Sequence, residues 1–377
     1  MRPVSIGGVA LTPVGEQWEL SLRDLACEAA LKALDSVEID HIDALYIANM
    51  AAAPIQGQLH LGAMLADALG LRRIPAIRVE AAQASGGVAI HEAYLAVASG
   101  LYDSVIVVGV EKMSDALPEE VRSALAMAED QEYTAYTGVT DIGLCALLHR
   151  LYMERYEAKP EEIASLAAVS HEHAVGCPHA QYPFKVSVER ILSSPMEADP
   201  IHMLECSGIG DGAAALILTA DAGNVEIAAS TVAVDHFFLT ERRDPLTLEA
   251  VRMASKRAYE MAGISPRDID LVELHDLTTI MGILSLEDLG FVEKGFGARY
   301  VSEGNVRRDG ELPVNTFGGL KARGNPVGAT GVYQVAEVAL QLLGEADRCQ
   351  VEDAETGLAE NLGGVASTCS ITILRRR

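Results

Sequence analysis

Short runs of apolar and β-branched residues alternate with longer alanine- and leucine-rich segments along the whole chain. The short runs have the length and composition of buried strands, and the longer segments carry apolar residues at helical spacing. Alternation of this kind predicts a layered α/β fold rather than a helical bundle or a β-sandwich. We predict strands at residues 44–48, 77–80, 105–110, 214–219, 225–234, 271–274 and 370–374, and helices at residues 21–34, 84–99, 246–261 and 329–343.

One helix-turn-strand unit near the start of the chain has a counterpart much later. Residues 29–49 and residues 258–276 each contain a helix end, a short acidic turn and a strand, and this match predicts two similar halves. A single matching pair can also arise by chance. The turn-forming residues 221–224 follow a predicted strand, so we place the boundary there and expect an N-terminal half at 1–222 and a C-terminal half at 223–377.

Composition excludes several classes of protein. Of the 377 residues, 49% are hydrophobic and 22% charged, which is typical of a soluble globular chain. Acidic residues number 54 against 29 basic ones, and the net charge of -25 argues against a nucleic-acid or anionic-membrane partner. The N-terminal residues contain no signal-peptide pattern, and no apolar run is long enough to span a membrane. We therefore expect a cytoplasmic protein.

The six cysteines indicate a reducing compartment. They contain no CxxC pair, and several lie in apolar stretches, so we expect reduced and mostly buried thiols. The cysteines are Cys27, Cys145, Cys177, Cys206, Cys349 and Cys369.

The segment 79–87, Val-Glu-Ala-Ala-Gln-Ala-Ser-Gly-Gly, runs from a predicted strand through a tight turn into a helix. This geometry would place Gln83 at a helix N-terminus, where backbone N–H groups and the helix dipole favour negative charge. Nucleophiles and bound anions occupy this position in other strand-turn-helix elbows. The same pattern is also typical of a plain turn between a strand and a helix.

Several further motifs occur in a fixed order along the chain. Together they resemble the thiolase superfamily over essentially the whole length, especially the sterol-carrier-type thiolases and their archaeal and bacterial relatives. The resemblance implies two similar βαβαβαββ halves packed as a five-layered αβαβα sandwich, and a dimer or tetramer. The motifs are residues 80–87, 109–114 (Gly-Val-Glu-Lys-Met-Ser), 178–183 (Pro-His-Ala-Gln-Tyr-Pro), 205–215, 273–276 (Glu-Leu-His-Asp) and 315–331.

Three positions depart from the pattern of that family. Gln83 stands where similar thiolases carry a nucleophilic cysteine, and a carboxamide cannot form an acyl-enzyme thioester. Leu277 replaces an acid/base cysteine in a His-Asp-Cys-Phe motif, so proton transfer through that thiol is lost. Asn325 stands where the sterol-carrier-type pattern has a histidine. Thiolysis through a cysteine-bound acyl group by the usual route is therefore not expected.

The polar residues that remain suit enolate chemistry. His275 and Asn325 can both donate hydrogen bonds to the oxygen of a thioester enolate. With Gln83 they are similar to the Cys-His-Asn set of chain-initiating ketoacyl synthases, in whose relatives a glutamine at the nucleophile position marks decarboxylases because its amide imitates an acylated cysteine. We expect an acyl-CoA pocket, lined by these three residues, that supports decarboxylation or carbon–carbon bond cleavage or formation without a covalent cysteine.

Two alternatives stay open. In the first, the protein is a non-catalytic subunit of a hetero-complex, and its pocket has drifted to neutral polar residues. A hetero-complex is plausible because some similar proteins borrow part of the CoA site from a small OB-fold, zinc-ribbon subunit. Conventional acyl transfer would need another nucleophile, and Cys369 is the thiol nearest a family-like C-terminal motif at residues 363–369. An engineered Gln83 would leave Leu277 and Asn325 unexplained, so natural divergence is the simpler reading.

A cluster of possible metal ligands lies between residues 171 and 179. Its spacing fits no standard zinc pattern, and the similar family has a polar loop without metal there, so we expect neither a metal nor another cofactor beside the CoA thioester substrate. The cluster consists of His171, His173, Cys177 and His179.

Other charged motifs have structural or substrate-binding interpretations. The resemblance implies that Asp211 and the pair Glu111-Lys112 support the site from beneath. Acyl-CoA also needs local positive charge, although a solvated surface is the default reading for arginine pairs. Three pairs are candidates: Arg72-Arg73, Arg242-Arg243 and Arg307-Arg308.

Overall fold

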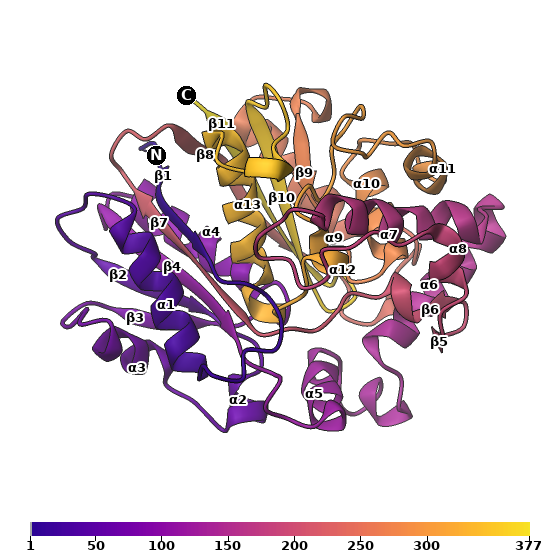
Figure 1. Cartoon of the computed structure of the whole chain (residues 1–377), viewed down its shortest axis with the longest axis horizontal. Helices are drawn as coiled ribbons and strands as arrows, with labels where there is room; N and C mark the ends of the chain where they lie inside the picture. Colours follow the sequence, from indigo (N-terminus) through magenta and orange to yellow (C-terminus); the bar gives the residue numbers. More distant parts are fainter. Residues whose placement is uncertain (1) are drawn as a thin grey trace.

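A computed structural model describes residues 2–377 and is shown in Figure 1. Within these residues, nine strands form a mixed sheet in the order β3-β2-β4-β7-β1-β8-β11-β10-β9, and β5 and β6 form a separate small hairpin. The strands are β1 (Ser5–Leu11), β2 (Ala44–Ala48), β3 (Ala76–Val79), β4 (Ser104–Glu111), β5 (Met196–Ala198), β6 (Ile201–His202), β7 (Gly212–Thr219), β8 (Val225–Val234), β9 (Leu271–Glu273), β10 (Thr356–Gly363) and β11 (Thr368–Arg376).

The large sheet consists of two sections that meet between β1 and β8. Those two strands share only the residue pair Ser5 and Glu226. By contrast, β1 pairs along its length with β7, and β8 pairs along its length with β11. Each section also contains parallel pairs, β2 with β3 and β4 in the first and β9 with β10 in the second. The first section is therefore β3-β2-β4-β7-β1, and the second is β8-β11-β10-β9.

The helices connect and cover these strands (Figure 1). Among residues 2–377, none is long and apolar enough to cross a membrane. The helices are α1 (Leu22–Asp35), α2 (Ala52–Gln56), α3 (Leu61–Ala68), α4 (Ser85–Ala98), α5 (Pro118–Leu125), α6 (Asp141–Tyr156), α7 (Pro160–Ala174), α8 (Val188–Leu192), α9 (Glu249–Ala262), α10 (Thr279–Asp288), α11 (Gly297–Ser302), α12 (Gly319–Ala322) and α13 (Thr330–Leu343).

Three hydrophobic cores define the layers. Alternate residues of a strand point to opposite faces, so each sheet section contributes to two cores. One face of the first section packs against α1 and α3. The opposite faces of both sections pack against α4 and α13, which form the middle layer. The remaining face of the second section packs against α9 and α10, with α6 and α7 beside them. This helix-sheet-helix-sheet-helix order confirms the predicted layered α/β sandwich.

The middle layer requires a close approach of two helices. A Cβ atom on Gly86 of α4 would lie only 2.7 Å from the backbone nitrogen of Gly331 in α13. A side chain at either position would force the helices apart. The glycines at 86 and 331 therefore have a packing role, and they hold the N-terminus of α4 against the C-terminal half.

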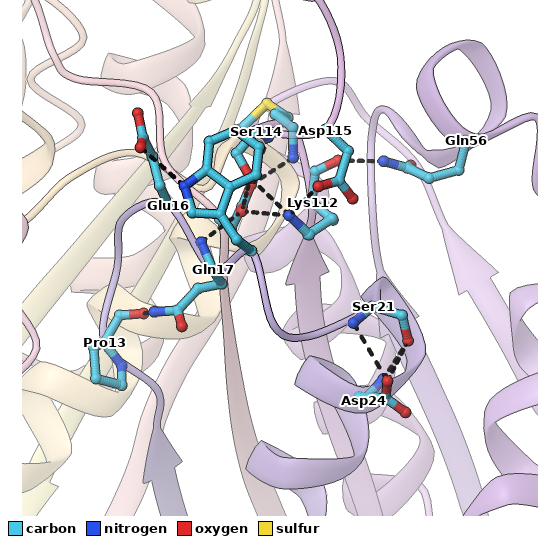
Figure 2. A network of polar contacts seen from close by, with 12 residues as sticks. Pro13, Glu16, Gln17, Ser21, Asp24, Gln56, Lys112, Ser114 and Asp115 are labelled. Atoms are coloured by element: carbon cyan, nitrogen blue, oxygen red, sulfur yellow. Dashed lines mark hydrogen bonds and ion pairs between the residues drawn. The ribbon is translucent and has the colours of Figure 1, made fainter.

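All predicted strands and helices occur in the structure, with shifts of a few residues at their ends. Ser21 caps α1 as a reciprocal pair with Asp24, visible in Figure 2, which explains why the helix begins there. The hydrophobic pattern did not reveal β1 and β10, because their glycines and polar residues interrupt the apolar run. The helix α10 was also not predicted, because all its residues are buried and it has no exposed polar face to show helical spacing.

Candidate functional site

A cavity of about 490 Å³ lies at the meeting point of several loops, and residues from both halves of the chain line it. Apolar atoms make up most of its surface, as is typical of small-molecule sites, and several polar and charged side chains also reach it. Two of the three residues singled out from the sequence, Gln83 and Asn325, line this cavity, as does Leu277.

Gln83 lies in the tight turn between β3 and α4. Ala82 in this turn has a φ of 51°, a left-handed conformation that alanine rarely adopts. The Ser85 hydroxyl fixes the turn: it accepts a hydrogen bond from the Ala81 N–H at 2.9 Å and donates one to the Ala82 carbonyl at 2.6 Å. The strand-turn-helix elbow expected from the sequence is thus present, with Gln83 at the start of the helix.

The carboxamide of Gln83 is held by the segment after β10. Its Oε1 accepts a hydrogen bond from the Gly364 N–H at 3.0 Å, where Gly364 has a left-handed φ of 58°. The amide nitrogen Nε2 is buried and has no hydrogen-bond partner among the described residues. A buried N–H donor without a partner is costly, and such groups are common where a ligand binds. One end of this amide is therefore fixed, and the other is available to a ligand.

Asn361 links Gln83 to His275. Its Oδ1 accepts a hydrogen bond from the Gly87 N–H at 3.0 Å, so the other side-chain atom is the amide nitrogen. That nitrogen donates to the backbone carbonyl of Gln83 at 3.1 Å and to the Nδ1 atom of His275 at 3.1 Å. Because Nδ1 is an acceptor in this arrangement, the imidazole proton lies on Nε2.

His275 is neutral at physiological pH. Burial, and secondarily the positive charge of Arg323, lowers the pKa of His275 to about 3. Its Nε2 is buried without a hydrogen-bond partner in the described chain, so the ring offers one free N–H donor. His275 is not among the residues that line the cavity, and Asn361 provides its connection to Gln83.

Asn325 is oriented by two hydroxyl groups. Its Oδ1 accepts a hydrogen bond from Thr330 Oγ1 at 2.7 Å, and its Nδ2 donates one to Ser207 Oγ at 3.3 Å. The backbone N–H of Asn325 also donates to the Gly208 carbonyl at 2.8 Å. One N–H of the Nδ2 amide has no partner within the described residues. Asn325 therefore presents a second neutral donor at the cavity wall.

Two residues of this site were not singled out from the sequence. Asn361 lies two residues before Gly363 on a strand that the hydrophobic pattern did not reveal. Lys321 lines the cavity, is 5% exposed, and donates from Nζ to the Cys206 carbonyl at 2.7 Å. Residues 315–331 also contain Arg323 and several other polar residues, so the local sequence does not distinguish Lys321 as a residue of the site.

Comparisons with known proteins agree with this architecture. Residues 4–222 match the family model described as "Thiolase, N-terminal domain", and residues 231–376 match "Thiolase C-terminal domain-like". The chain belongs to the thiolase family. It is 46% identical to an acetyl-CoA acetyltransferase of Methanothermobacter thermautotrophicus, with 100% of both chains covered.

More distant relatives of this thiolase-family chain carry other names. It is 30% identical to the benzoylsuccinyl-CoA thiolase subunit BbsB of Thauera aromatica, covering 93% of this chain and 92% of that protein. It is also 30% identical to human sterol carrier protein 2, covering 96% of this chain and 70% of that protein. A solved structure titled "Ltp2-ChsH2(DUF35) aldolase" has the same fold, with a TM-score of 0.85, 23% identity and coverage of 99% and 98%.

The cysteines of this thiolase-family protein differ in their access to the cavity. Cys369 lies in β11, opposite Leu362 of β10, inside the hydrophobic core, and burial raises the pKa of its thiol well above the ordinary value. It is therefore a core residue, without the exposure and low pKa of a nucleophile. Cys206 is the cysteine that lines the cavity, and burial raises the pKa of its thiol to about 12.

Asp211 is the centre of a buried network that joins two loops. It accepts hydrogen bonds from the backbone N–H groups of Met113 at 2.6 Å and Gln17 at 3.0 Å, and from Lys112 Nζ at 2.9 Å. Figure 2 shows Gln17, Lys112 and Ser114 around this point. Burial opposes ionisation of Asp211, but hydrogen bonds from Ser114, Lys112 and Met113 hold its pKa below the ordinary value. These contacts suit the structural role expected from the sequence.

Glu111 has a related position at the end of β4. Its carboxylate accepts hydrogen bonds from the backbone N–H groups of Met50 and Ala51, which follow β2. Burial raises the pKa of Glu111 to about 8. Glu111 thus ties the ends of two neighbouring strands together.

The histidines and cysteine between residues 171 and 179 serve separate contacts. The Nδ1 atoms of His171 and His173 are hydrogen-bonded to the carbonyls of Phe184 and Val314, and His179 pairs with Glu337 at 2.8 Å. Cys177 packs in a small apolar cluster. Within residues 2–377, no group of three or more His, Cys, Asp or Glu side chains is arranged to hold a metal ion.

The three arginine pairs proposed for CoA do not line the cavity. Arg72 pairs with Asp67 on the surface, and Arg307 lies 3.7 Å from Glu172. Arg242 is buried and pairs with Asp235 at 3.3 Å. The arginine that does line the cavity is Arg122, on α5.

The buried carboxyl group of Glu360, which lies next to His275, makes the free energy of unfolding depend on pH. Its Oε2 accepts a hydrogen bond from the backbone N–H of His275 at 3.3 Å, and burial raises the pKa of Glu360 from 4.5 to about 8. Between those two values the unfolded chain loses the proton while the folded chain keeps it. This group therefore lowers the free energy of unfolding as pH rises, by at most about 1.4 kcal/mol per pH unit.

We expect Glu360→Gln to become progressively more stable relative to wild type as pH rises from about 5 to 8. Urea unfolding at several pH values measures this difference. Glu355→Gln, at a side chain that is 72% exposed, is the matched control and is expected to show no such trend. A constant difference between Glu360→Gln and wild type would contradict the elevated pKa.

Proposed function

We propose that this thiolase-family protein binds an acyl-CoA thioester and stabilises its enolate without forming a covalent bond to a cysteine. The observation that carries the proposal is a set of neutral donors left unused by the protein: Gln83 Nε2, Asn325 Nδ2 and His275 Nε2. Preorganised neutral donors of this kind stabilise negative charge that develops on an oxygen atom. Gln83 and Asn325 line the cavity, whereas His275 does not, so the proposal requires the thioester oxygen to reach past the cavity wall to His275 Nε2. The fixed tautomer of His275 supports the proposal, because it leaves the Nε2 proton available as a donor.

The chemistry we propose is cleavage or formation of a carbon–carbon bond next to the thioester. In a decarboxylation, the electron pair of the bond to the carboxylate carbon moves onto the thioester oxygen, carbon dioxide leaves, and Cα then takes a proton from water. In a retro-aldol cleavage, the β-hydroxyl group loses its proton to water and its oxygen becomes the carbonyl of the departing aldehyde or ketone. The electron pair of the Cα–Cβ bond moves onto the thioester oxygen, and Cα then takes a proton from water. Gln83 supplies a hydrogen bond in either case, because its carboxamide cannot accept an acyl group.

Conventional acyl transfer is the second candidate. The names of two relatives, acetyl-CoA acetyltransferase and benzoylsuccinyl-CoA thiolase, support both a CoA thioester and acyl transfer. The thiol of Cys206 in the cavity is a possible acyl acceptor. Its pKa of about 12 leaves very little reactive thiolate at neutral pH, which favours the enolate proposal.

Incubation with malonyl-, methylmalonyl-, acetoacetyl- and β-hydroxyacyl-CoA, followed by mass spectrometry, tests the two candidates. We expect turnover of at least one thioester, no acyl adduct on the intact protein, and unchanged turnover in Cys206→Ser. An adduct on Cys206 together with loss of turnover in that variant would instead establish acyl transfer. Neither turnover nor binding would favour a non-catalytic subunit.

The organisation of the protein in the cell is also a proposal. We retain two halves at residues 1–222 and 223–377, and a cytoplasmic location, which the six free cysteines support. We further propose a homo-oligomer: β3 is an edge strand whose Ile77 is 50% exposed, and such edges favour strand pairing. A complex with an OB-fold, zinc-ribbon subunit remains the alternative assembly.

A further inference from the structure

Lys321 is a buried cation at the wall of the cavity. It lies on the short helix α12, is 5% exposed, and its Nζ donates to the Cys206 carbonyl at 2.7 Å. An ammonium group has three N–H donors, so two remain. Among residues 2–377, no carboxylate lies within ion-pair distance of it. Burial lowers the pKa of Lys321, and the more distant Asp276 opposes this by favouring the charged form. A buried charge without a partner is unfavourable in the empty protein, and an anionic ligand would relieve that cost.

The other charged residues at the cavity do not supply this partner. Arg122 and Glu197 are exposed, and Asp141 is half-buried at the first turn of α6. Burial raises the pKa of Asp141, which disfavours its charged form. His171 stays neutral at physiological pH because burial, and then the charge of Lys321, lowers its pKa to about 4. The buried charge at the wall is therefore positive.

The nearest aromatic contact leaves the ammonium free to bind a ligand. The ring centroid of Tyr182 lies 5.9 Å from Lys321 Nζ, a distance at which the ring face attracts a cation weakly. Gln83 and Asn325 line the same cavity: Gln83 Nε2 has no hydrogen-bond partner among the described residues, and Asn325 Nδ2 uses one of its two N–H groups on Ser207. The wall thus offers a positive charge together with neutral donors, an arrangement that suits a ligand with two oxygen groups, one of them charged.

We propose that Lys321 recognises a free carboxylate on the acyl part of the substrate, so that the substrate class is a CoA thioester of a dicarboxylic acid. This inference rests on the proposed function and specifies which thioester the site selects. The thioester oxygen accepts hydrogen bonds from the side-chain amides of Gln83 and Asn325, and the carboxylate pairs with the Lys321 ammonium through charge-assisted hydrogen bonds. Lys321 is a specificity-determining residue in this arrangement, and no covalent step passes through it.

The test compares malonyl-CoA with its methyl ester, which has nearly the same shape but no carboxylate charge. Binding of both is measured by calorimetry in the His275→Ala background, with mass spectrometry to confirm that the thioesters stay intact. With Lys321 present, we expect malonyl-CoA to bind at least about tenfold more tightly than the ester, as expected for a hydrogen bond to a charged group. Lys321→Met should abolish this preference, and Lys321→Arg should retain part of it.

Controls separate recognition from a structural role. Lys256→Met removes an exposed lysine on α9 by the same substitution, and we expect it to leave the preference unchanged. If Lys321→Met weakens both thioesters equally, Lys321 acts only through the Cys206 carbonyl and the inference is wrong. An undiminished preference in Lys321→Met also overturns it, while the proposed function stands. If neither compound binds when Lys321 is present, the inference is wrong. The proposed function itself fails only if the wild-type protein also neither binds nor turns over any of the four thioesters named above.

Discussion

Replacing His275 with alanine is expected to lower the turnover number for the thioester substrate by about 100-fold or more, the usual cost of removing one donor from an oxyanion hole. The reason is the fixed tautomer: Asn361 donates to Nδ1, which leaves the proton on Nε2 for the enolate oxygen. Because this contact strengthens as charge develops, the turnover number should fall far more than the affinity for the thioester. Steady-state kinetics and equilibrium binding measure the two separately.

Two further variants make this result specific. His236→Ala, at an exposed histidine, is the matched control and should keep full turnover. Asn361→Leu removes the amide that holds the tautomer, and we expect a comparable loss although His275 is still present. Circular dichroism and urea unfolding establish that each variant is folded. A folded His275→Ala protein with wild-type turnover would refute the proposed role of this imidazole.

The largest effect on stability is expected for Asp211→Asn, a loss of about 3 kcal/mol in the free energy of unfolding, at the lower end for breaking a buried ion pair. Every contact to this carboxylate comes from a donor, including Lys112 Nζ and the backbone N–H groups of Gln17 and Met113. An asparagine would direct its own amide hydrogens at some of these donors. Lys112 is 1% exposed and keeps Asp115 as a partner at 2.8 Å, which limits the loss.

Urea unfolding at neutral pH measures this loss. Asp115→Asn is the matched control, because its side chain is 54% exposed and contacts the same lysine. We expect that variant to lose less than about 1 kcal/mol, as for other solvent-exposed ion pairs. Equal effects of the two substitutions would show that the buried network around Asp211 does not hold the loops together.

The predicted part of the site follows from local sequence. The turn before Gln83 is specified by residues within a few positions, since Ser85 bonds to Ala81 and Ala82. Asn325 was found because it replaces a histidine in a motif, and the structure places it in the cavity with Gln83. His275 came from the same resemblance. Its tautomer could not be predicted, because it depends on Asn361, which lies 86 residues away along the chain.

Lys321 and Cys206 show why the other residues of the site could not be predicted from the sequence. The sequence places a lysine next to alanine and arginine in an ordinary motif, and nothing local shows that its ammonium is buried. Burial results from the packing of α12 and α7 around the cavity, and from the loop that brings the Cys206 carbonyl to Nζ. Cys369 was a weak candidate from the sequence because it borders a predicted strand, and strand pairing does place it in the core.

The sequence alone determined the α/β class, most of the strands and helices, and the elbow at Gln83, because periodicity, capping and turn preferences act over a few residues. Only the tertiary structure decided which donors face the cavity, which histidine nitrogen carries the proton and which cation is buried. Those properties depend on contacts such as that between Gln83 and Gly364, which are 281 residues apart. Such contacts form only when α4, α13 and the strand β10 pack together in the folded chain.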